Sequence, residues 1–170
     1  MSEGPFYGKY RANVIMNIDP MQVGRIQVMC PDVSGFIPST WCMPCVPVAG
    51  INMGIFTVPP IGSGVWIEFE RGDPDYPIWV GGYWGVMAET PLLAKAVPPG
   101  LAGITLQTTL KNGIVISDTP GPTGGILIQT TTGAMISVSD VGITISNGKG
   151  AIITMMGPMI DMNVGALQVT

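Results

Sequence analysis

Histidine is absent from this sequence, and charge is scarce: 11% of the 170 residues are Asp, Glu, Lys or Arg, and the net charge is −4. A structural zinc ion needs four Cys or His ligands, and the chain offers only three cysteines. Nucleic-acid affinity comes mainly from neutralising phosphates with Lys and Arg, and the sequence has no basic run. These absences argue against a zinc site and against a nucleic-acid-binding protein.

Long apolar segments are also missing. No stretch of about 18 apolar residues occurs, so we expect no membrane-spanning helix. Residues 1–5 lack the charged and apolar regions of a signal peptide. We therefore expect a protein that is synthesised in the cytoplasm and that leaves it, if at all, by a route other than general secretion.

Aromatic residues and most charges are confined to the first half of the chain. All twelve aromatics lie between Phe6 and Trp84, and residues 86–170 contain none. Helix signals are nearly absent apart from a turn or two within residues 86–97. With 24 glycines and 16 prolines, the composition predicts an all-β fold in which the first half can build a compact core.

The last 68 residues carry a repeat marked by glycine. Eight glycines recur at intervals of 7 to 12 residues, and most of them open a short run in which aliphatic and small polar residues alternate. Alternation with a period of two predicts strands, and the recurring spacing predicts a stack of strand–turn units. The marking glycines are Gly103, Gly113, Gly125, Gly133, Gly142, Gly150, Gly157 and Gly165.

One face of this stack is aliphatic. The other face is mostly Thr, Ser and Gln, with exceptions such as Val115 and Leu127. The aliphatic face therefore requires burial. We expect its core to consist of Ile104, Leu106, Ile114, Ile116, Ile126, Ile128, Ile136, Val138, Ile143, Ile145, Ile153, Met155, Ile160, Met162, Leu167 and Val169.

Two arrangements could bury this face. A single-chain solenoid with three strands per coil needs about 24 residues per coil, so 68 residues give fewer than three coils, where three or more are usual. Alternatively, three chains could wind together, each giving one strand per layer. We favour the three-chain arrangement, because open edges in a lone chain would leave backbone groups of the ladder unpaired.

The first half reads as a small barrel. Strands are expected at residues 7–18, 24–30, 41–48, 64–70 and 78–83, with turn clusters rich in Gly, Pro and Asp between them. Five short strands with long loops fit a Greek-key barrel of the oligonucleotide/oligosaccharide-binding (OB) type, with a sandwich-like fold as the alternative.

Short motifs spread over about 65 residues of this half resemble one protein family. They are Asp19-Pro20 with Gly24-Arg25-Ile26-Gln27-Val28; Trp41 and Pro44 with Gly50 and Gly54; Pro59-Pro60, Gly62, Gly64-Val65, Glu68-Phe69-Glu70 and Gly72-Asp73-Pro74; and Pro77-Ile78, Val80-Gly81. In this order, and followed by a β-helical repeat, they resemble the central spikes of contractile phages (the baseplate assembly protein V group) and the spike proteins of type VI secretion systems. Most of these residues are explained by turn chemistry.

The resemblance implies a homotrimeric structural spike of a contractile injection apparatus. The implied parts are an OB barrel over residues 1–85, a linker over 86–102, marked by Pro91 and the Pro98–Gly100 run, and an intertwined triple-stranded β-helix over 103–170. The implied partners are a hub or baseplate protein at the barrel end and a tip protein of the Pro-Ala-Ala-Arg repeat kind at the C-terminal end. The last six residues are uncharged, which fits docking of the tip protein at Leu167, Val169 and Thr170, with a frayed terminus as the alternative. The spike would link the hub and tube to the tip and pierce the target envelope, which it would contact only transiently.

The sequence departs from some relatives in two places. Only residues 85–102 separate the barrel from the repeat, where some phage spikes carry a glycan-cleaving domain. Type VI spikes often carry a hub domain before the barrel; here the barrel is expected to begin near residue 7, so we expect a hub, if present, to be a separate protein. Spikes that cap themselves with a metal tend to use histidines, which are absent here. We expect no enzyme activity, no catalytic residues, no cofactor and no metal ligands.

Other chemistries were weighed against this interpretation. Residues 41–45 (Trp-Cys-Met-Pro-Cys) resemble the redox site of thioredoxins, but the segment that follows (Val-Pro-Val-Ala-Gly, residues 46–50) cannot form the helix which that site needs. Cys42 and Cys45 are expected to be small strand or loop residues, and the sequence leaves open whether they are free thiols or form a disulfide with Cys30. Glu68, Glu70, Asp73 and Asp75 are expected to be solvated rim charges, and Trp66, Trp79 and Trp84 to pack in the core or between subunits. The alternative function is a carbohydrate- or protein-binding barrel with an adhesive β-tail.

Overall fold

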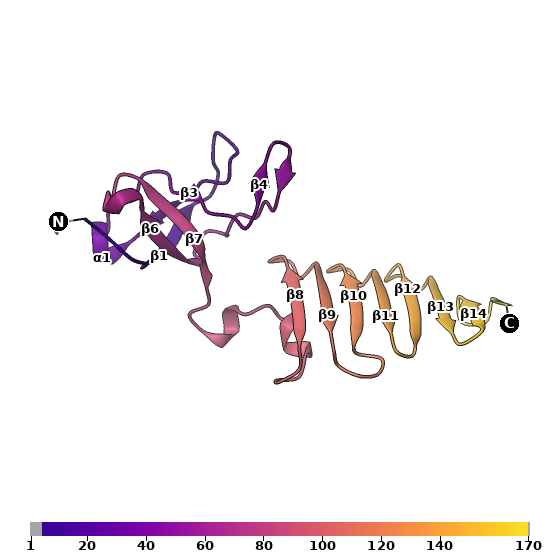
Figure 1. Cartoon of the computed structure of the whole chain (residues 1–170). Helices are drawn as coiled ribbons and strands as arrows, with labels where there is room; N and C mark the ends of the chain where they lie inside the picture. The colour runs from indigo at the N-terminus through magenta and orange to yellow at the C-terminus, as the bar shows by residue number, and fades with distance from the viewer. Residues whose placement is uncertain (1–4, 170) are drawn as a thin grey trace. The chain divides into compact units, whose positions relative to one another are not determined.

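The computed structural model describes residues 5–169, and the chain divides into two compact units, Met1–Glu89 and Thr90–Thr170. Both units are built almost wholly of β-strands, which confirms the all-β prediction (Figure 1). No helix within residues 5–169 is both long and apolar enough to cross a membrane.

The first unit is a five-stranded sheet in the order β2-β1-β6-β7-β3. Its strands are β1 (Tyr10–Met16), β2 (Gln27–Met29), β3 (Met43–Pro44), β6 (Gly64–Phe69) and β7 (Pro77–Tyr83). All neighbours are antiparallel except β3 and β7, which are parallel. Such a curled, mixed sheet is consistent with the predicted OB-type barrel.

Several local expectations for this unit were wrong. The strand expected at 41–48 is only two residues long, because proline has no N–H to give to a ladder and residues 44 and 47 are both prolines. The turn cluster between the strands expected at 24–30 and 41–48 contains a short helix, α1 (Pro31–Ser34), which starts on its proline. A small hairpin of β4 (Ala49–Gly50) and β5 (Met53–Gly54) was not anticipated.

The core of the barrel follows from alternation on the strands. Ala12 and Val14 point inward from β1, and Val65 and Ile67 point inward from β6; each is at most 2% exposed. The other core residues are Ile26, Val28, Cys30, Cys42 and Trp79. The indole Nε1 of Trp79 donates to the carbonyl oxygen of Gly24 at 3.1 Å, so the buried ring has no unsatisfied polar atom.

Asp19 organises the loop between β1 and β2. Its carboxylate accepts the backbone N–H groups of Met21, Val23 and Arg25 at 3.0 to 3.1 Å. It also pairs with the Arg25 guanidinium at 2.7 Å, and the Asp19 side chain is only 4% exposed. The Arg25 guanidinium in turn lies over the Trp41 ring, at 5.2 Å from its centroid. The Asp19-Pro20 and Gly24-Arg25 motifs therefore belong to one hydrogen-bonded cluster centred on Asp19.

The cluster centred on Asp19 predicts that the barrel loses stability at acidic pH. The hydrogen bond from Arg25, with those from backbone N–H groups, holds the pKa of Asp19 well below its usual range. A pKa that is lower in the folded state than in the unfolded state stabilises the fold above about pH 4, and this stability is lost as the pH falls below that value. Replacing Asp19 with Asn should lower the midpoint of barrel unfolding at pH 7 and flatten its dependence on pH below 4.

Tryptophan fluorescence measures this unfolding selectively, because all four tryptophans lie between residues 41 and 84. The matched control is Asp75→Asn, a change at an exposed carboxylate of the same unit, which should behave like the wild type. Equal midpoints for both variants at pH 7 would contradict the structural role of Asp19.

The second unit is one eight-stranded antiparallel ladder, with strands in chain order from β8 to β15. Its strands are β8 (Gly103–Gln107), β9 (Gly113–Ser117), β10 (Gly125–Gln129), β11 (Met135–Ser139), β12 (Gly142–Ser146), β13 (Ile152–Met156), β14 (Met159–Met162) and β15 (Leu167–Val169). Each strand pairs with its neighbours along the same chain. The expectation that a lone chain would leave the ladder unpaired was therefore wrong, because the meander supplies its own hydrogen bonds.

The connections alternate between the two edges of this ladder. Residues 108–112, 130–134, 147–151 and 163–166 form the four-loop edge, and residues 118–124, 140–141 and 157–158 form the three-loop edge. Loops on the four-loop edge also bond to one another: the N–H of Thr131 donates to Oδ1 of Asn112 at 3.0 Å. The edges are thus ordered parts of the ladder.

Two short 3₁₀ turns, η2 (Met87–Glu89) and η3 (Leu93–Ala96), occupy the segment where the sequence allowed a turn or two of helix. η3 packs on β8 and β9. The N–H of Leu93 donates to Oε1 of Gln107 at 2.8 Å, and the Leu93 side chain fills the space left open by Gly113. The η3 segment is therefore bound to the ladder.

Candidate trimer interface

The sixteen residues that the sequence places on the aliphatic face form two unbroken rows across the ladder. In each row, every residue is the cross-strand partner of the next. The first row is Ile104, Ile116, Ile126, Val138, Ile143, Met155, Ile160 and Val169. The second row is Leu106, Ile114, Ile128, Ile136, Ile145, Ile153, Met162 and Leu167. The two rows lie on one face because they occupy alternate positions of each strand.

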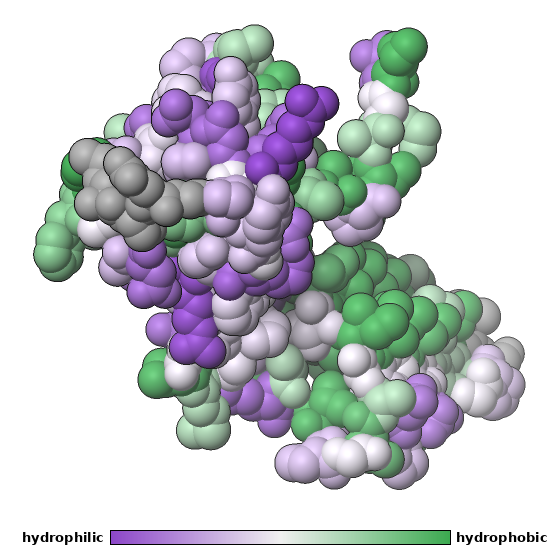
Figure 2. Space-filling view, turned by 60° about the vertical axis from the view of Figure 1, so that its left-hand side comes forward, coloured by the Kyte–Doolittle hydropathy of each residue, from purple (hydrophilic) through white to green (hydrophobic). Residues whose placement is uncertain are grey.

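In the single chain this face is open to solvent. Ile104 and Leu106 are 62% and 66% exposed, and Ile126, Ile128 and Ile136 are 42–43% exposed. Figure 2 shows the hydrophobic colour gathered on the second unit. A contiguous apolar surface of this length is unusual on a monomer and marks an interaction site. Burying a fully exposed aliphatic side chain contributes about 1.5–3 kcal/mol, and each of these half-buried side chains would gain part of that on becoming fully buried.

The opposite face is partly covered by the chain itself. Where η3 packs over β8 and β9, Val115 and Ser117 are only 6% and 7% exposed. This explains why Val115 breaks the polar pattern of its face. The sequence carried a signal for this cover in Leu92 and Leu93, an apolar pair just before the repeat.

At the C-terminal end of the ladder, Leu167 is 55% exposed. Its backbone pairs with that of Met162, so β15 is the last strand of the sheet. Thr170 and the side chain of Val169, which the sequence also assigned to tip docking, lie outside the described part of the structure.

The acidic residues of the barrel do not converge on one point. The exposed Glu68 carboxylate pairs with Lys9. Asp73 accepts the N–H of Asp75 at 3.0 Å within its own turn. These carboxylates have structural roles on the surface.

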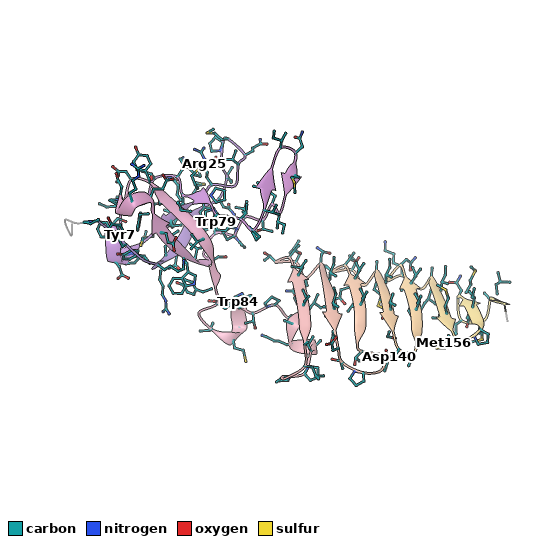
Figure 3. All side chains as sticks on the ribbon, viewed as in Figure 1. Tyr7, Arg25, Trp79, Trp84, Asp140 and Met156 are labelled. Atoms are coloured by element: carbon teal, nitrogen blue, oxygen red, sulfur yellow. The ribbon has the colours of Figure 1, made fainter. Side chains whose placement is uncertain are left out.

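The tryptophans do not form a common platform either. Trp79 is buried, and Trp66 packs against Tyr83 with 5.1 Å between ring centroids. The Arg11 guanidinium lies over both of these rings. Trp84 is 62% exposed. Figure 3 shows Trp79 and Trp84 in different parts of the chain.

The cysteines are arranged unlike a redox pair. All three are free thiols, and Cys30 and Cys42 are buried. Burial raises the pKa of the Cys42 thiol to about 11, and burial also raises the pKa of Cys30. A redox cysteine needs the opposite shift, usually from the start of a helix, whereas Cys42 is followed by β3.

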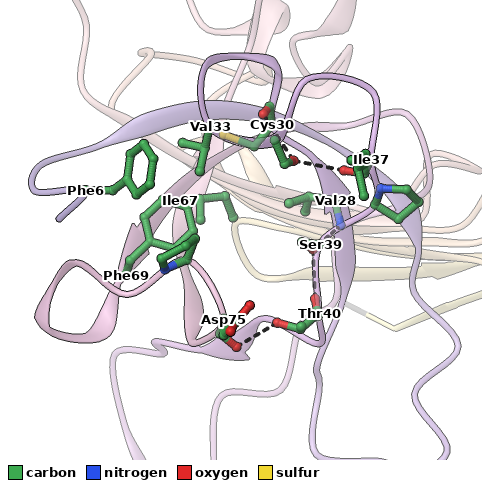
Figure 4. A pocket seen from close by; sticks show the side chains of 13 residues that line it. Phe6, Val28, Cys30, Val33, Ile37, Ser39, Thr40, Ile67, Phe69 and Asp75 are labelled. Carbon is green, nitrogen blue, oxygen red and sulfur yellow. Dashed lines mark hydrogen bonds between the residues drawn. The ribbon is translucent and has the colours of Figure 1, made fainter. Parts of the chain in front are cut away.

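Sequence reasoning missed one cleft in the barrel. It has a volume of about 340 Å³ and is lined mainly by apolar side chains, including Phe6, Val33, Ile37 and Phe69 (Figure 4). Its hydroxyl groups are occupied: Thr40 Oγ1 donates to the carbonyl oxygen of Asp75 at 2.9 Å, and Ser39 Oγ donates to that of Thr40 at 2.8 Å. The cleft offers an apolar surface, and its walls come from segments too distant in sequence to form a motif.

A barrel joined to a ladder with one unburied aliphatic face defines a class of protein, a fibrous structural protein that assembles from copies of itself. Comparison with protein families supports this. Residues 10–84 match the type VI secretion system/phage-baseplate injector OB domain, and residues 103–168 match the phage baseplate V C-terminal trimerisation domain. Comparison with curated proteins gives no match.

Together the two family models match most of the chain, in the order barrel and then trimerisation domain. The chain therefore belongs to the family of central spike proteins of phage baseplates and type VI secretion systems, as its motifs predicted. Its role is that of a structural baseplate spike, and its C-terminal domain forms a homotrimer.

Proposed function

We propose that three copies of this chain form a needle that links the hub and tube of a contractile injection apparatus to a tip protein and pierces the target envelope. Residues 1–85 are the adaptor barrel, 86–102 the connection and 103–170 the needle. The observation that carries this proposal is the pair of aliphatic rows, which run through all eight strands from Ile104 to Val169.

Three such faces turned toward one axis would bury both rows of every chain. Strands in a sheet are spaced by about 4.8 Å, so eight strands extend over roughly 40 Å along the axis. The hydrogen bonds between neighbouring strands of each ladder run along this axis, and the side chains between the three sheets would be packed without water. Such a rod resists bending, which is the property that transmission of a sheath-driven thrust requires.

The barrel also has surface suited to a protein partner. Ile51, Met53, Ile55 and Phe56 lie in and just after the β4–β5 hairpin, and they are 51–96% exposed. Exposed aromatic and aliphatic side chains of this size mark protein–protein contacts. We assign this surface to the hub, and the end of the ladder at Leu167 to the tip protein.

Solution mass tests the assembly directly. Light scattering of the purified full chain should give about 53 kDa, three times the 17.8 kDa of one copy. The mass should stay constant on dilution into the nanomolar range, because the two rows of every chain are buried together. A mass near 18 kDa would contradict the proposed trimeric needle, and the alternative of a monomeric binding barrel would then be preferred.

A further inference from the structure

Charged residues in the ladder are sorted by sign between its two edges. Lys111 and Lys149 lie on the four-loop edge, and Asp118 and Asp140 lie on the three-loop edge. Figure 3 shows Asp140 at the turn between β11 and β12. From residue 103 to 169 one further charged residue occurs, Asp161 within β14, whose carboxylate accepts the N–H of Gly165 at 2.6 Å.

These four side chains cannot pair within their own chain. All four residues are exposed, and the ion pairs of the described residues are both in the barrel. A five-residue strand separates the two edges by about 17 Å, since each residue advances the chain by about 3.4 Å. Each edge therefore presents uncompensated charge of one sign.

A closed ring of three copies brings unlike edges together. In a cyclic trimer every contact joins one patch of a protomer to a different patch of the next. With the aliphatic rows inside, the four-loop edge of one copy meets the three-loop edge of its neighbour at each of three seams. Rotation about the long axis does not change the height of a residue, so the heights can be compared directly.

The charges fall at matching heights. Lys111 and Asp118 lie in the loops at the two ends of β9, and Asp140 and Lys149 lie in the loops at the two ends of β12. Each lysine is thus about one strand spacing, roughly 4.8 Å, from its opposite aspartate along the axis. The long, flexible lysine side chain spans this offset.

We propose that Lys111–Asp118 and Lys149–Asp140 ion pairs between neighbouring copies close the seams of the needle. This inference rests on the proposed three-fold packing of the aliphatic rows. Exposed ion pairs contribute little to stability, so their main effect is on choice of partner. Pairing of two four-loop edges would oppose lysines to lysines, and the resulting repulsion selects the cyclic trimer.

Zero-length carbodiimide cross-linking of the native full chain tests the pairing. It joins an amine to a carboxylate only when they are in contact, and the linked peptides can be identified by mass spectrometry. Links from Lys111 to Asp118 and from Lys149 to Asp140 are expected. Because of the 17 Å strand between the edges, any such link joins two chains. Acetylation of both lysines by a monofunctional reagent serves as the reactivity control.

A charge swap tests the same seam by a second route. The Lys111–Asp118 pair is chosen, with the changes Lys111→Asp and Asp118→Lys. The Lys149–Asp140 pair is less suitable, because the Asp140 carboxylate also accepts the N–H of Gly121 at 3.1 Å, and a change there would break this bond as well. Either single change should weaken the trimer roughly tenfold at low salt, because it is repeated at three seams, and the loss should shrink at high salt. The double variant should restore wild-type assembly, whereas Lys95→Asp, the same change away from the edges, should have no effect.

The outcomes separate the seam from the trimer itself. A trimer whose reactive lysines give neither link, or a double variant no better than the single ones, overturns the seam pairing and leaves the needle intact. A chain that stays monomeric at all concentrations overturns both.

Discussion

An Ile136→Asp variant is expected to remain monomeric under conditions in which the wild type is trimeric. Ile136 lies in β11, near the middle of the second aliphatic row, and pairs with Ile128 and Ile145. In the trimer the change removes three buried isoleucines and brings three carboxylates together near the axis. We expect a loss of at least about 10 kcal/mol per trimer. Sedimentation or light scattering at micromolar concentration measures it.

The adjacent residue provides a control with the opposite expectation. In the single chain Ile136 is 42% exposed, whereas Ser137 on the other face is less exposed. An isolated chain would therefore accept aspartate at 136 more readily than at 137. The needle reverses this order, and Ser137→Asp should still form trimers. If the Ile136→Asp variant formed trimers and the Ser137→Asp variant did not, the inner and outer faces of the ladder would be assigned the wrong way round.

Replacing Gly142 with alanine is expected to destabilise the ladder at its centre by about 3 kcal/mol per chain. Gly142 begins β12 with a φ of +150°, and a Cβ there would stand 2.2 Å from the carbonyl oxygen of Met155. That oxygen belongs to the backbone of β13, so it cannot move without separating the two strands. Thermal unfolding followed by circular dichroism gives the size of the effect.

Gly157→Ala separates crowding from backbone strain. Gly157 also has a positive φ, of +54°, but no atom lies within 4 Å of the position that a Cβ would take. This change should cost only the strain of the left-handed conformation, about 1 kcal/mol. If both alanine variants melted at the same temperature, the close approach of β12 and β13 would not be what requires glycine at 142.

The repeat was read well from sequence because its information is local. Each strand of the ladder pairs with the strand before it, so the alternation of Ile and Thr within five residues also defines the face of the whole sheet. In the last unit the aliphatic residues stand two and four positions after Gly165, at Leu167 and Val169, and the sequence placed them on the same face; they pair with Met162 and Ile160. Local period and global face coincide in a meander.

The barrel was read less completely, because its contacts join distant residues. Asp19 and Arg25 were recognised as parts of a motif, but the bonds from Asp19 to three N–H groups appear only in the folded loop. The cleft beside Phe6 and Phe69 likewise unites segments more than sixty residues apart.

By itself, the sequence determined the strand period, the two faces of the repeat, the segregation of aromatics and the family motifs, since each depends on residues that are close along the chain. The tertiary structure alone decided that the strands of the ladder pair with one another within one chain. It also decided that η3 packs over β8 and β9, and that the lysines and aspartates lie on opposite edges of the ladder. These features depend on the direction in which successive strands run and on where their loops emerge. Such geometry arises only when the backbone hydrogen bonds are made.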